Sequence, residues 1–310
     1  MEGIEASPHG QRGCPESSML VRTASNTGTL PPVPEIEANG ITINYEEWGD
    51  EEAPAVVLLH GFSSDLRMWS PTVEAFARDY RVIAPDLRGH GRSSVPADLE
   101  SYTMEAYVED LRALLDSLSV EICALVGCSF GGMIAVQAAV SLPERLAGVV
   151  LSDSSAAYMN AAYDERYRER ERGIAAEEAM IAQHGTAGAG KRAAANVSDP
   201  FLADGIRKRY ERIQGDGFLG AARVRRERPD LVGVIGAQIK SPVLICTGDE
   251  DPVHCASLLM AEQLPAARVV TFRNTGHGIP VRAPDLFAET VLRFFSDIEE
   301  GKPLSGRRTI

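Results

Sequence analysis

The chain has 310 residues, of which 44% are hydrophobic and 24% charged, a composition typical of a globular protein with a sizeable core. Its formal net charge at pH 7 is −13, which should repel nucleic acid and anionic lipid surfaces. Composition therefore argues against nucleic-acid and membrane partners. It favours a neutral or cationic substrate, unless a local basic pocket reverses the field.

Cysteine usage and the first residues bear on the cellular compartment. The five cysteines are scattered, without the spacing of zinc ligands. The chain starts Met-Glu-Gly-Ile-Glu, without the basic start and apolar stretch of a secretory signal, and no apolar run is long enough to span a bilayer. These features predict a reduced, cytoplasmic protein; they leave the oligomeric state open.

The pattern of apolar residues predicts an α/β fold. Alternating runs at 35–37 and 41–45 flank Asn39-Gly40, which is a strong signal for a β-hairpin. Helical patterns lie further along the chain, at 104–118, 133–139 and 286–295. Short apolar runs, as in strands buried on both faces of a parallel sheet, recur along the chain at 55–59, 82–84, 123–126, 149–151, 243–246 and 269–272.

One long region interrupts this alternation of strands and helices. From about residue 156 to residue 238 there is no strand-like run, and Ala, Arg and Glu become frequent. Residues 164–172 mix both charges at helical spacing, which is typical of a solvated helix face, and the Gly-rich segment 185–190 is predicted to be a loop. The predicted organisation is a flexible tail over 1–34, an α/β core over 35–155 and 239–298, a helical cap (lid) over 156–238, and a C-terminal tail over 299–310.

The segment 127–132, Gly-Cys-Ser-Phe-Gly-Gly, has the pattern of a nucleophile elbow. It follows a buried strand and opens a helix, as that motif requires. The tight turn needs small neighbours and holds the hydroxyl of Ser129 at its tip, where the helix N-terminus favours a developing anion. The alternative is a Gly-rich turn without catalytic function, which the partner residues in the appropriate chain order make unfavourable.

A serine hydroxyl needs a base that accepts its proton, and in this type of site the base follows the acid in the chain. His277 fits, because it lies in a loop just after the last apolar run; His254 is the only rival. For the acid that holds the base, the loop after strand 243–246 offers Asp251 as first choice, Asp249 as the alternative and Glu250 as the least suitable.

An oxyanion needs two backbone N–H donors, which we expect from Phe62 and Phe130. The side chains of Phe62, Trp69 and Phe130 are candidates to bind an apolar substrate, although aromatic residues are more often part of a core. The segment 86–93, Asp-Leu-Arg-Gly-His-Gly-Arg-Ser, lacks the ending of a phosphate-binding loop. It is predicted to be a structural loop in which Asp86 pairs with an arginine.

Together, these segments resemble the landmarks of the α/β-hydrolase family, namely His60-Gly61, 86–93, 127–132, 248–253 and Gly276-His277. The resemblance covers roughly residues 35–298 and is nearest to the esterase, lactonase and carbon–carbon hydrolase branch, such as 3-oxoadipate enol-lactonase. It implies a mostly parallel sheet of about eight strands with a lid before the acid strand. The site residues that it implies are a triad of Ser129, Asp251 and His277, with oxyanion donors Phe62 and Phe130.

The function predicted from the sequence is hydrolysis of an ester or lactone through an acyl-enzyme, without a metal or organic cofactor. The substrate is expected to be a small molecule, neutral and partly apolar. The serine at position 129 argues against haloalkane dehalogenases and soluble epoxide hydrolases, which use aspartate there. Carbon–carbon bond hydrolysis, perhydrolase activity and ligand reception without turnover remain as alternatives; an inert receptor has the least need of a complete triad.

Overall fold

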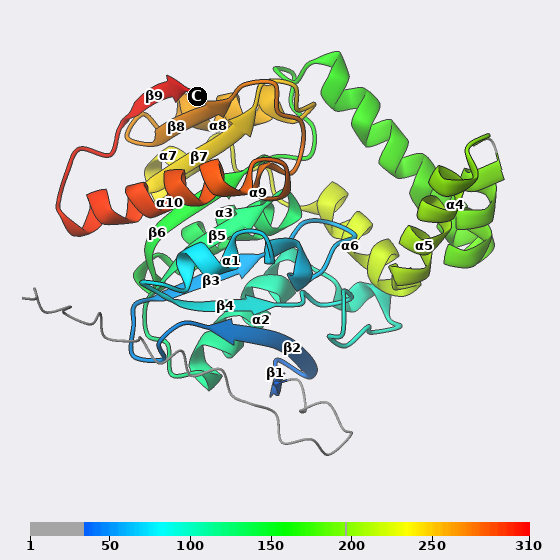
Figure 1. Ribbon diagram of the computed structural model, residues 1–310, viewed down its shortest axis with the longest axis horizontal. Coiled ribbons are helices and arrows are strands. Elements are labelled where there is room, and N and C mark those ends of the chain that lie inside the picture. The colour runs from blue at the N-terminus through cyan, green and yellow to red at the C-terminus, as the bar shows by residue number, and fades with distance from the viewer. Residues whose placement is uncertain (1–33, 196) are drawn as a thin grey trace, which may run out of the picture. The chain divides into compact units, whose positions relative to one another are not determined.

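The computed structural model describes residues 34–195 and 197–310, so the predicted N-terminal tail lies outside the described residues except for position 34. A nine-stranded sheet runs through the described chain (Figure 1). Its strands are β1 (Glu35–Ala38), β2 (Ile41–Trp48), β3 (Ala55–Leu59), β4 (Arg81–Pro85), β5 (Cys123–Cys128), β6 (Leu146–Ser152), β7 (Val243–Gly248), β8 (Arg268–Phe272) and β9 (Gly306–Thr309). Their spatial order is β1-β2-β4-β3-β5-β6-β7-β8-β9.

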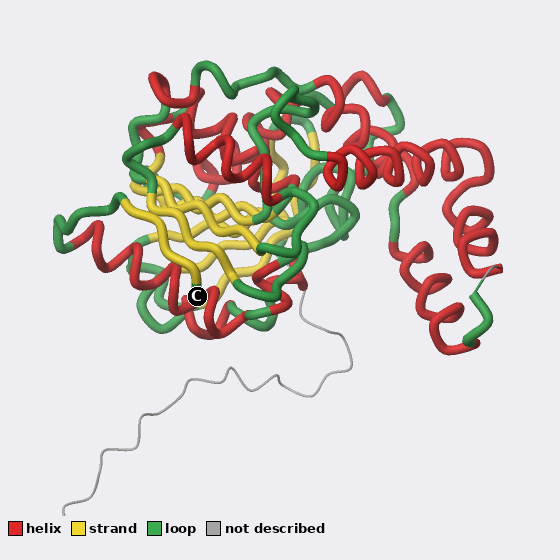
Figure 2. The backbone as a smooth tube through the Cα atoms, turned by 90° about the horizontal axis from the view of Figure 1, so that it is seen from above, coloured by secondary structure: helices red, strands yellow, loops and turns green. Residues whose placement is uncertain are grey.

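Helices lie on both sides of this sheet, as the view from above shows (Figure 2). The helices are α1 (Val73–Phe76), α2 (Met104–Ser117), α3 (Phe130–Ser141), α4 (Glu165–Ala195), α5 (Pro200–Arg212), α6 (Gly215–Glu227), α7 (Ile235–Gln238), α8 (His254–Gln263), α9 (Ile279–Arg282) and α10 (Pro284–Glu299). Short 3₁₀ turns add Leu66–Trp69, Leu99–Ser101 and Pro143–Arg145.

The pairing of the strands confirms the predicted α/β class. The first two strands form the predicted hairpin, with Asn39 and Gly40 at φ of 49° and 74° in its turn. Strand β2 is antiparallel to β4, and every further pair in the sheet is parallel. The carboxyl ends of β3, β5, β6, β7 and β8 therefore meet at one edge of the sheet, where the connecting loops can bring distant residues together.

The ninth strand was not predicted. Residues 306–309, Gly-Arg-Arg-Thr, lie in the segment predicted to be a C-terminal tail, but they pair in parallel with β8 at the end of the sheet. All four are exposed, so this strand buries no apolar face. Hydrophobic periodicity misses such a strand because it depends on backbone pairing alone.

Two hydrophobic clusters fill the space between the sheet and its helices. Side chains alternate along the strands, so that in β3 Val57 and Leu59 pack in one cluster and Val56 and Leu58 in the other. The first cluster includes residues of α2 and α3, and the second includes residues of α1 and α10. These two layers hold the central strands rigidly, and with them the loops at their carboxyl ends.

The loop after β4 is structural, but the predicted pairing within it is wrong. The carboxylate of Asp86 accepts hydrogen bonds from the backbone N–H groups of Leu66 and Arg92, each at 2.8 Å, and from Asn44. The buried guanidinium of Arg88 pairs instead with Asp110 of α2 at 2.6 Å. Backbone amides satisfy a buried carboxylate without a counter-charge, which the sequence pattern did not reveal.

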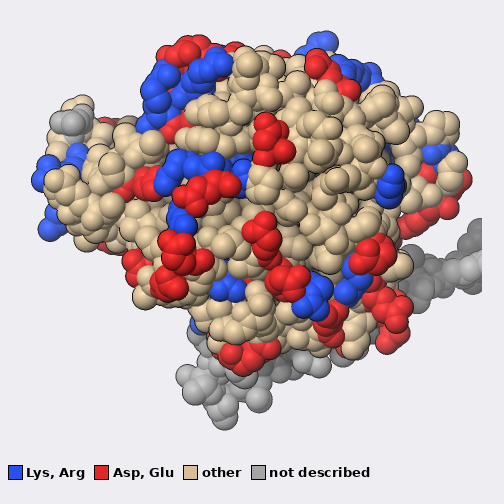
Figure 3. Space-filling view, turned by 180° about the vertical axis from the view of Figure 1, so that it is seen from behind, with Lys and Arg blue, Asp and Glu red and all other residues tan. Residues whose placement is uncertain are grey.

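Helices α4, α5 and α6, which we call the cap helices, follow β6 and precede β7 in the chain, and they extend to one side of the sheet (Figure 1). The segment 185–190 is not the predicted loop: Gly185 breaks the helix with φ 65° and ψ 171°, and the residues that follow are helical again. None of the described helices combines the length and the apolar character that crossing a membrane requires. On the face drawn in Figure 3, acidic and basic side chains are intermixed.

Candidate active site

Ser129 lies at the junction of β5 and α3, in the left-handed region of φ (54°). Its N–H donates to the carbonyl of Ser152 at 2.8 Å. A Cβ on Gly127 would lie 2.3 Å from the carbonyl oxygen of Gly131, and a Cβ on Gly131 would lie 2.1 Å from that of Leu59. The glycines of the motif are thus required by close backbone contacts that hold the serine at the tip of the turn.

His277 contacts both predicted partners, one through each ring nitrogen. Its Nε2 lies 2.9 Å from Oγ of Ser129, and its Nδ1 lies 2.9 and 3.1 Å from the two carboxylate oxygens of Asp251. A carboxylate at Nδ1 holds the proton on that nitrogen, so Nε2 presents its lone pair to the serine hydroxyl. This arrangement can accept the proton of Ser129.

Of the three candidate acids, the structure brings only Asp251 to His277. Its carboxylate is fully buried and also accepts the N–H of Val253 at 2.8 Å. Burial alone would raise the pKa of this carboxyl, but the hydrogen bonds and charge of His277 outweigh it and keep the pKa below its usual value. Asp249 and Glu250 are exposed, and the rival base His254 contacts Thr247.

A second carboxyl, which the sequence analysis missed, lies behind the triad. Asp153 follows β6, is fully buried, and accepts the N–H groups of Gly278 and Ile279 at 3.0 and 2.8 Å. Burial raises the pKa of Asp153 well above its ordinary value, and the neighbouring charge of Asp251 raises it further. Of these two neighbouring carboxyls, Asp153 is therefore the one that holds a proton more readily. Its position directly after a buried strand was the available sequence signal.

The backbone of the loop after β3 lies beside the elbow. A Cβ on Gly61 would be 3.5 Å from Cβ of Ser129. Within residues 34–195 and 197–310, the N–H groups of Phe62 and Phe130 donate no hydrogen bond to another part of the chain. Both amides are thus available to a ligand next to the serine, as an oxyanion hole would need.

The three aromatic side chains predicted to bind substrate are in different surroundings. Trp69 is fully buried against Phe287 in the cluster beneath α1 and α10, so its prediction is wrong. The ring of Phe130 is also fully buried, packed on Tyr107 of α2, and belongs to the core. Only the ring of Phe62 is partly exposed, and it contacts the cap residue Phe218 at 4.6 Å between ring centroids.

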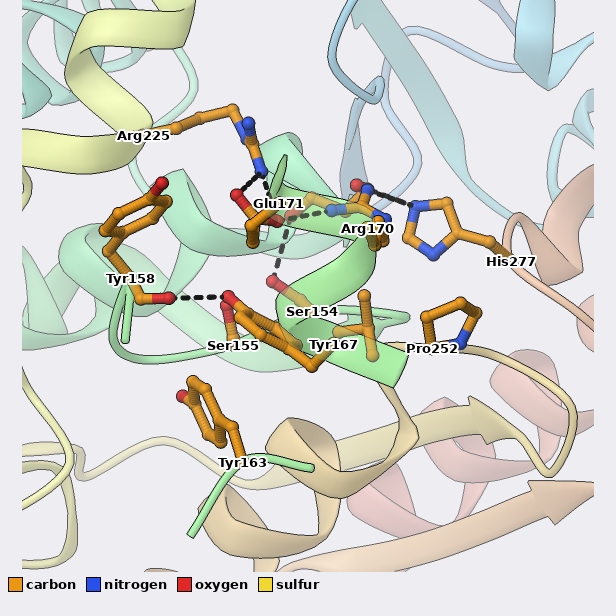
Figure 4. Close-up of polar contacts among 12 residues, drawn as sticks. Ser154, Ser155, Tyr158, Tyr163, Tyr167, Arg170, Glu171, Arg225, Pro252 and His277 are labelled. Atoms are coloured by element: carbon orange, nitrogen blue, oxygen red, sulfur yellow. Dashed lines mark hydrogen bonds and ion pairs between the residues drawn. The ribbon is translucent and has the colours of Figure 1, made fainter. Parts of the chain in front are cut away.

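The cap contributes a cation that the sequence analysis assigned to a solvated helix face. Arg170 of α4 lies with Nη2 3.3 Å from Nε2 of His277, and its Nη1 donates to Glu171 at 2.7 Å (Figure 4). Glu171 is itself buried and binds Arg225 of α6 through both oxygens. The prediction is wrong for these positions because Tyr167, Glu171 and Ile181 form the buried stripe of α4.

The chain belongs to the α/β-hydrolase fold family, whose sequence pattern matches residues 54–284. Epoxide hydrolase 4 of Mus musculus is 38% identical over 116 residues, 37% of this chain and 32% of that relative. The chain spans about a third or less of the length of such epoxide hydrolases. The 3-oxoadipate enol-lactonase 2 of Acinetobacter baylyi is 29% identical over 224 residues, 70% of this chain and 79% of that relative.

A solved structure extends this likeness to the whole fold. The enol-lactonase from Burkholderia xenovorans has a TM-score of 0.67 and 26% identity, over 85% of this chain and 100% of that chain. The predicted family is therefore confirmed.

Proposed function

We propose that this protein is a serine hydrolase that cleaves an ester or lactone of a small molecule through an acyl-enzyme. The observation that carries the proposal is the unbroken contact chain from Ser129 through His277 to Asp251, with 2.9 Å at both junctions. A hydroxyl, an imidazole and a buried carboxylate in this order form the arrangement that activates a serine for acyl transfer.

In the first half of the reaction, Oγ of Ser129 attacks the carbonyl carbon while Nε2 of His277 takes the hydroxyl proton. The carbonyl oxygen becomes an oxyanion, which the N–H groups of Phe62 and Phe130 stabilise. The tetrahedral intermediate then collapses, the bond to the leaving oxygen breaks, and His277 returns the proton to that oxygen.

In the second half, water replaces the alcohol. His277 takes a proton from the water, the hydroxide adds to the acyl carbon, and the bond to Oγ of Ser129 breaks as His277 returns the proton. Asp251 stabilises the imidazolium in both halves, and Asp153 holds the loop after His277 in place through the N–H groups of Gly278 and Ile279.

The comparisons support an ester or lactone bond as the target. Two enol-lactonases are similar to this chain over most of its length, and each is by its name an enzyme that acts on a lactone. The epoxide hydrolase relatives align by sequence over a much shorter segment, although an epoxide hydrolase structure shares the fold over 85% of this chain at 22% identity. The serine at position 129 differs from the aspartate of the soluble epoxide hydrolases.

The test is the Ser129→Ala variant with nitrophenyl acetate as substrate. We expect kcat/KM to fall by about 10⁴-fold or more, since the nucleophile is lost, with an unchanged circular dichroism spectrum. Ser141→Ala is the matched control, because Ser141 lies exposed at the end of the same helix and, among the residues that the structure describes, its hydroxyl binds only Gln137. Turnover by Ser129→Ala at the rate of the control would refute the acyl-enzyme.

A further inference from the structure

The guanidinium of Arg170 lies beside the ring nitrogen of His277 that moves the proton in the proposed reaction. Its side chain is only 18% exposed, and Nη2 is 3.3 Å from Nε2 of His277, the nitrogen that exchanges a proton with both nucleophile and leaving group (Figure 4). In the proposed reaction, Nε2 gives its proton to the leaving oxygen. Arg170 therefore lies on the leaving-group side of the site.

The contact of Arg170 with His277 is unsuited to catalysis as it stands. With its proton on Nδ1, the ring has one lone pair at Nε2, and the hydroxyl of Ser129 at 2.9 Å and the N–H of Arg170 at 3.3 Å both donate to it. A guanidinium also has no acceptor and stays charged, so it opposes the positive charge that the imidazole takes up during the reaction. A productive complex needs Arg170 to turn to another partner.

The cap holds more positive than negative charge at this point. Arg170 and Arg225 bind the same carboxylate, that of Glu171, and Arg228 donates to the backbone carbonyl of Arg225. Arg228 is bound by neutral oxygens, including Oγ of Ser155 at 2.8 Å. Three positive charges and one negative charge leave a local excess of two, although the whole chain carries −13.

Both carboxylate oxygens of Glu171 are already bound by Arg225, the more deeply buried of its two arginine partners. Arg225 is 2% exposed and binds both oxygens of Glu171 at 2.7 and 2.8 Å, whereas Arg170 reaches only one of them. In the described part of the chain, Nη2 of Arg170 has no hydrogen-bond partner other than His277. A largely buried cation in this state binds a second carboxylate with its planar fork, as guanidiniums do wherever an acid has to be recognised.

We propose that Arg170 binds a carboxylate on the leaving-group side of the substrate, so that the ester or lactone cleaved at this site is an acidic one. The inference rests on the proposed function and specifies the class of its substrate. When Arg170 binds the substrate carboxylate, it moves away from Nε2 of His277, and the lone pair of that nitrogen is left to the hydroxyl of Ser129. An acidic substrate therefore also brings the catalytic residues into their reactive arrangement. This proposal replaces the expectation of a neutral or cationic substrate, which came from the net charge of the whole chain, because the charge of the cap next to His277 is positive.

The experiment compares two esters of nearly equal shape, meta-acetoxybenzoate and meta-acetoxybenzamide, which differ in the charge of the group attached to the leaving phenol. Their kcat/KM values are measured for the wild-type chain, Arg170→Gln and Arg170→Lys. The matched control is Arg172→Gln, on the same helix, because the Arg172 side chain is 61% exposed and, within residues 34–195 and 197–310, forms an ion pair only with Glu165.

We expect the wild-type chain and Arg172→Gln to prefer the benzoate, and Arg170→Gln to lose about 10- to 100-fold of that preference, mainly through the KM of the benzoate. Arg170→Lys should keep part of it, since the charge remains and the fork is lost. A purely structural role for Arg170 would lower both rates and leave their ratio unchanged.

Two outcomes would overturn the inference: a wild-type ratio near one, whatever the variants do, or an unchanged ratio in Arg170→Gln. Failure of the proposed function is distinguishable, because it would appear as turnover of both esters by Ser129→Ala. If Ser129→Ala is inactive and the ratio does not depend on Arg170, the serine mechanism stands and the acidic substrate is rejected.

Discussion

The sheet edge and the cap form the same site by different physical means. At the edge, backbone geometry places the chemistry: Ser129 is held by glycines in contact with neighbouring main chain, and His277 by amides that bind Asp153. In the cap, charged side chains on helices do so, as Arg170, Glu171 and Arg225 illustrate. Main-chain constraints leave clear sequence motifs, whereas side-chain networks on a helix leave only a distribution of charges.

The largest effects are expected from substitutions of the two buried acids at the sheet edge, Asp251 and Asp153. Asp251→Asn should lower kcat by about 10⁴-fold, because an amide no longer holds the reactive tautomer of His277. Asp153→Asn should retain activity within about 10-fold, since the amide oxygen can still accept from Gly278 and Ile279, and the raised pKa of Asp153 favours an uncharged group at this position.

Asp153→Ala completes this set of variants. It removes the acceptor for the N–H groups of Gly278 and Ile279, so we expect a loss of about 10- to 100-fold relative to Asp153→Asn. The measurement is steady-state kinetics with nitrophenyl acetate. An Asp153→Asn variant as inactive as Asp251→Asn would show that Asp153 has to be ionised, which contradicts the raised pKa of that carboxyl.

Substitution of one glycine in α3 and one in the cap helix α4 tests how the two regions differ in their contribution to the free energy of unfolding. In α3, a Cβ on Gly131 would overlap the carbonyl of Leu59, so Gly131→Ala should lower the free energy of unfolding by about 3 kcal/mol or more. In the cap helix α4, a Cβ on Gly173 would meet nothing within 4 Å. There the same change should raise the free energy of unfolding by about 0.5–1 kcal/mol.

Urea unfolding of both glycine variants against the wild type measures the difference. If the two substitutions changed the free energy of unfolding equally, the backbone contact at the elbow would not be the reason for the glycine motif. The sign matters more than the size, because destabilisation in the core and stabilisation in the cap have separate physical causes.

The smallest expected effect concerns a histidine buried beside the site. His90 is 4% exposed, packs near Phe62 and Phe130, and its Nδ1 donates to the carbonyl of Arg88. Burial, together with the nearby His60, lowers its pKa to about 3. Between pH 6.5 and pH 4 the unfolded chain therefore binds a proton at this residue that the native chain does not, and stability is lost as pH falls.

His90→Asn keeps a donor for Arg88 and removes the titration. The slope of the free energy of unfolding against pH should decrease by about 1.4 kcal/mol per pH unit between pH 6 and pH 4, relative to the wild type. Urea unfolding at pH 6, 5 and 4 provides the slopes. Equal slopes in the two proteins would mean that His90 is protonated in the native state.

The sequence predicted best what depends on local backbone chemistry. The Asn39-Gly40 turn, the buried strands and the family landmarks required no knowledge of distant contacts, and neither did the choice of the serine. Position within a loop also favoured Asp251 over Asp249, and the structure brings Asp251 to His277. Where the pattern alone determined the geometry, prediction and structure agree.

What failed depended on long-range partners. Trp69 was a candidate to bind substrate, but it lies buried in the second hydrophobic cluster. Asp86 was predicted to pair with an arginine, but the nearby Arg88 pairs with Asp110. The charges of α4 could not be divided into inner and outer ones until the cap helices were packed, and so Arg170 was missed. A residue's sequence neighbours do not identify the charge that it meets from another element.

Strand β9, which the sequence analysis did not predict, forms one edge of the sheet. An open sheet presents unpaired N–H and C=O groups along its last strand, which invite a strand from another chain. Here the apolar β8 is followed by the short β9, whose two neighbouring arginines, Arg307 and Arg308, are both exposed. Two positively charged side chains on this strand disfavour the pairing of a second copy with it, because like charges would then face each other.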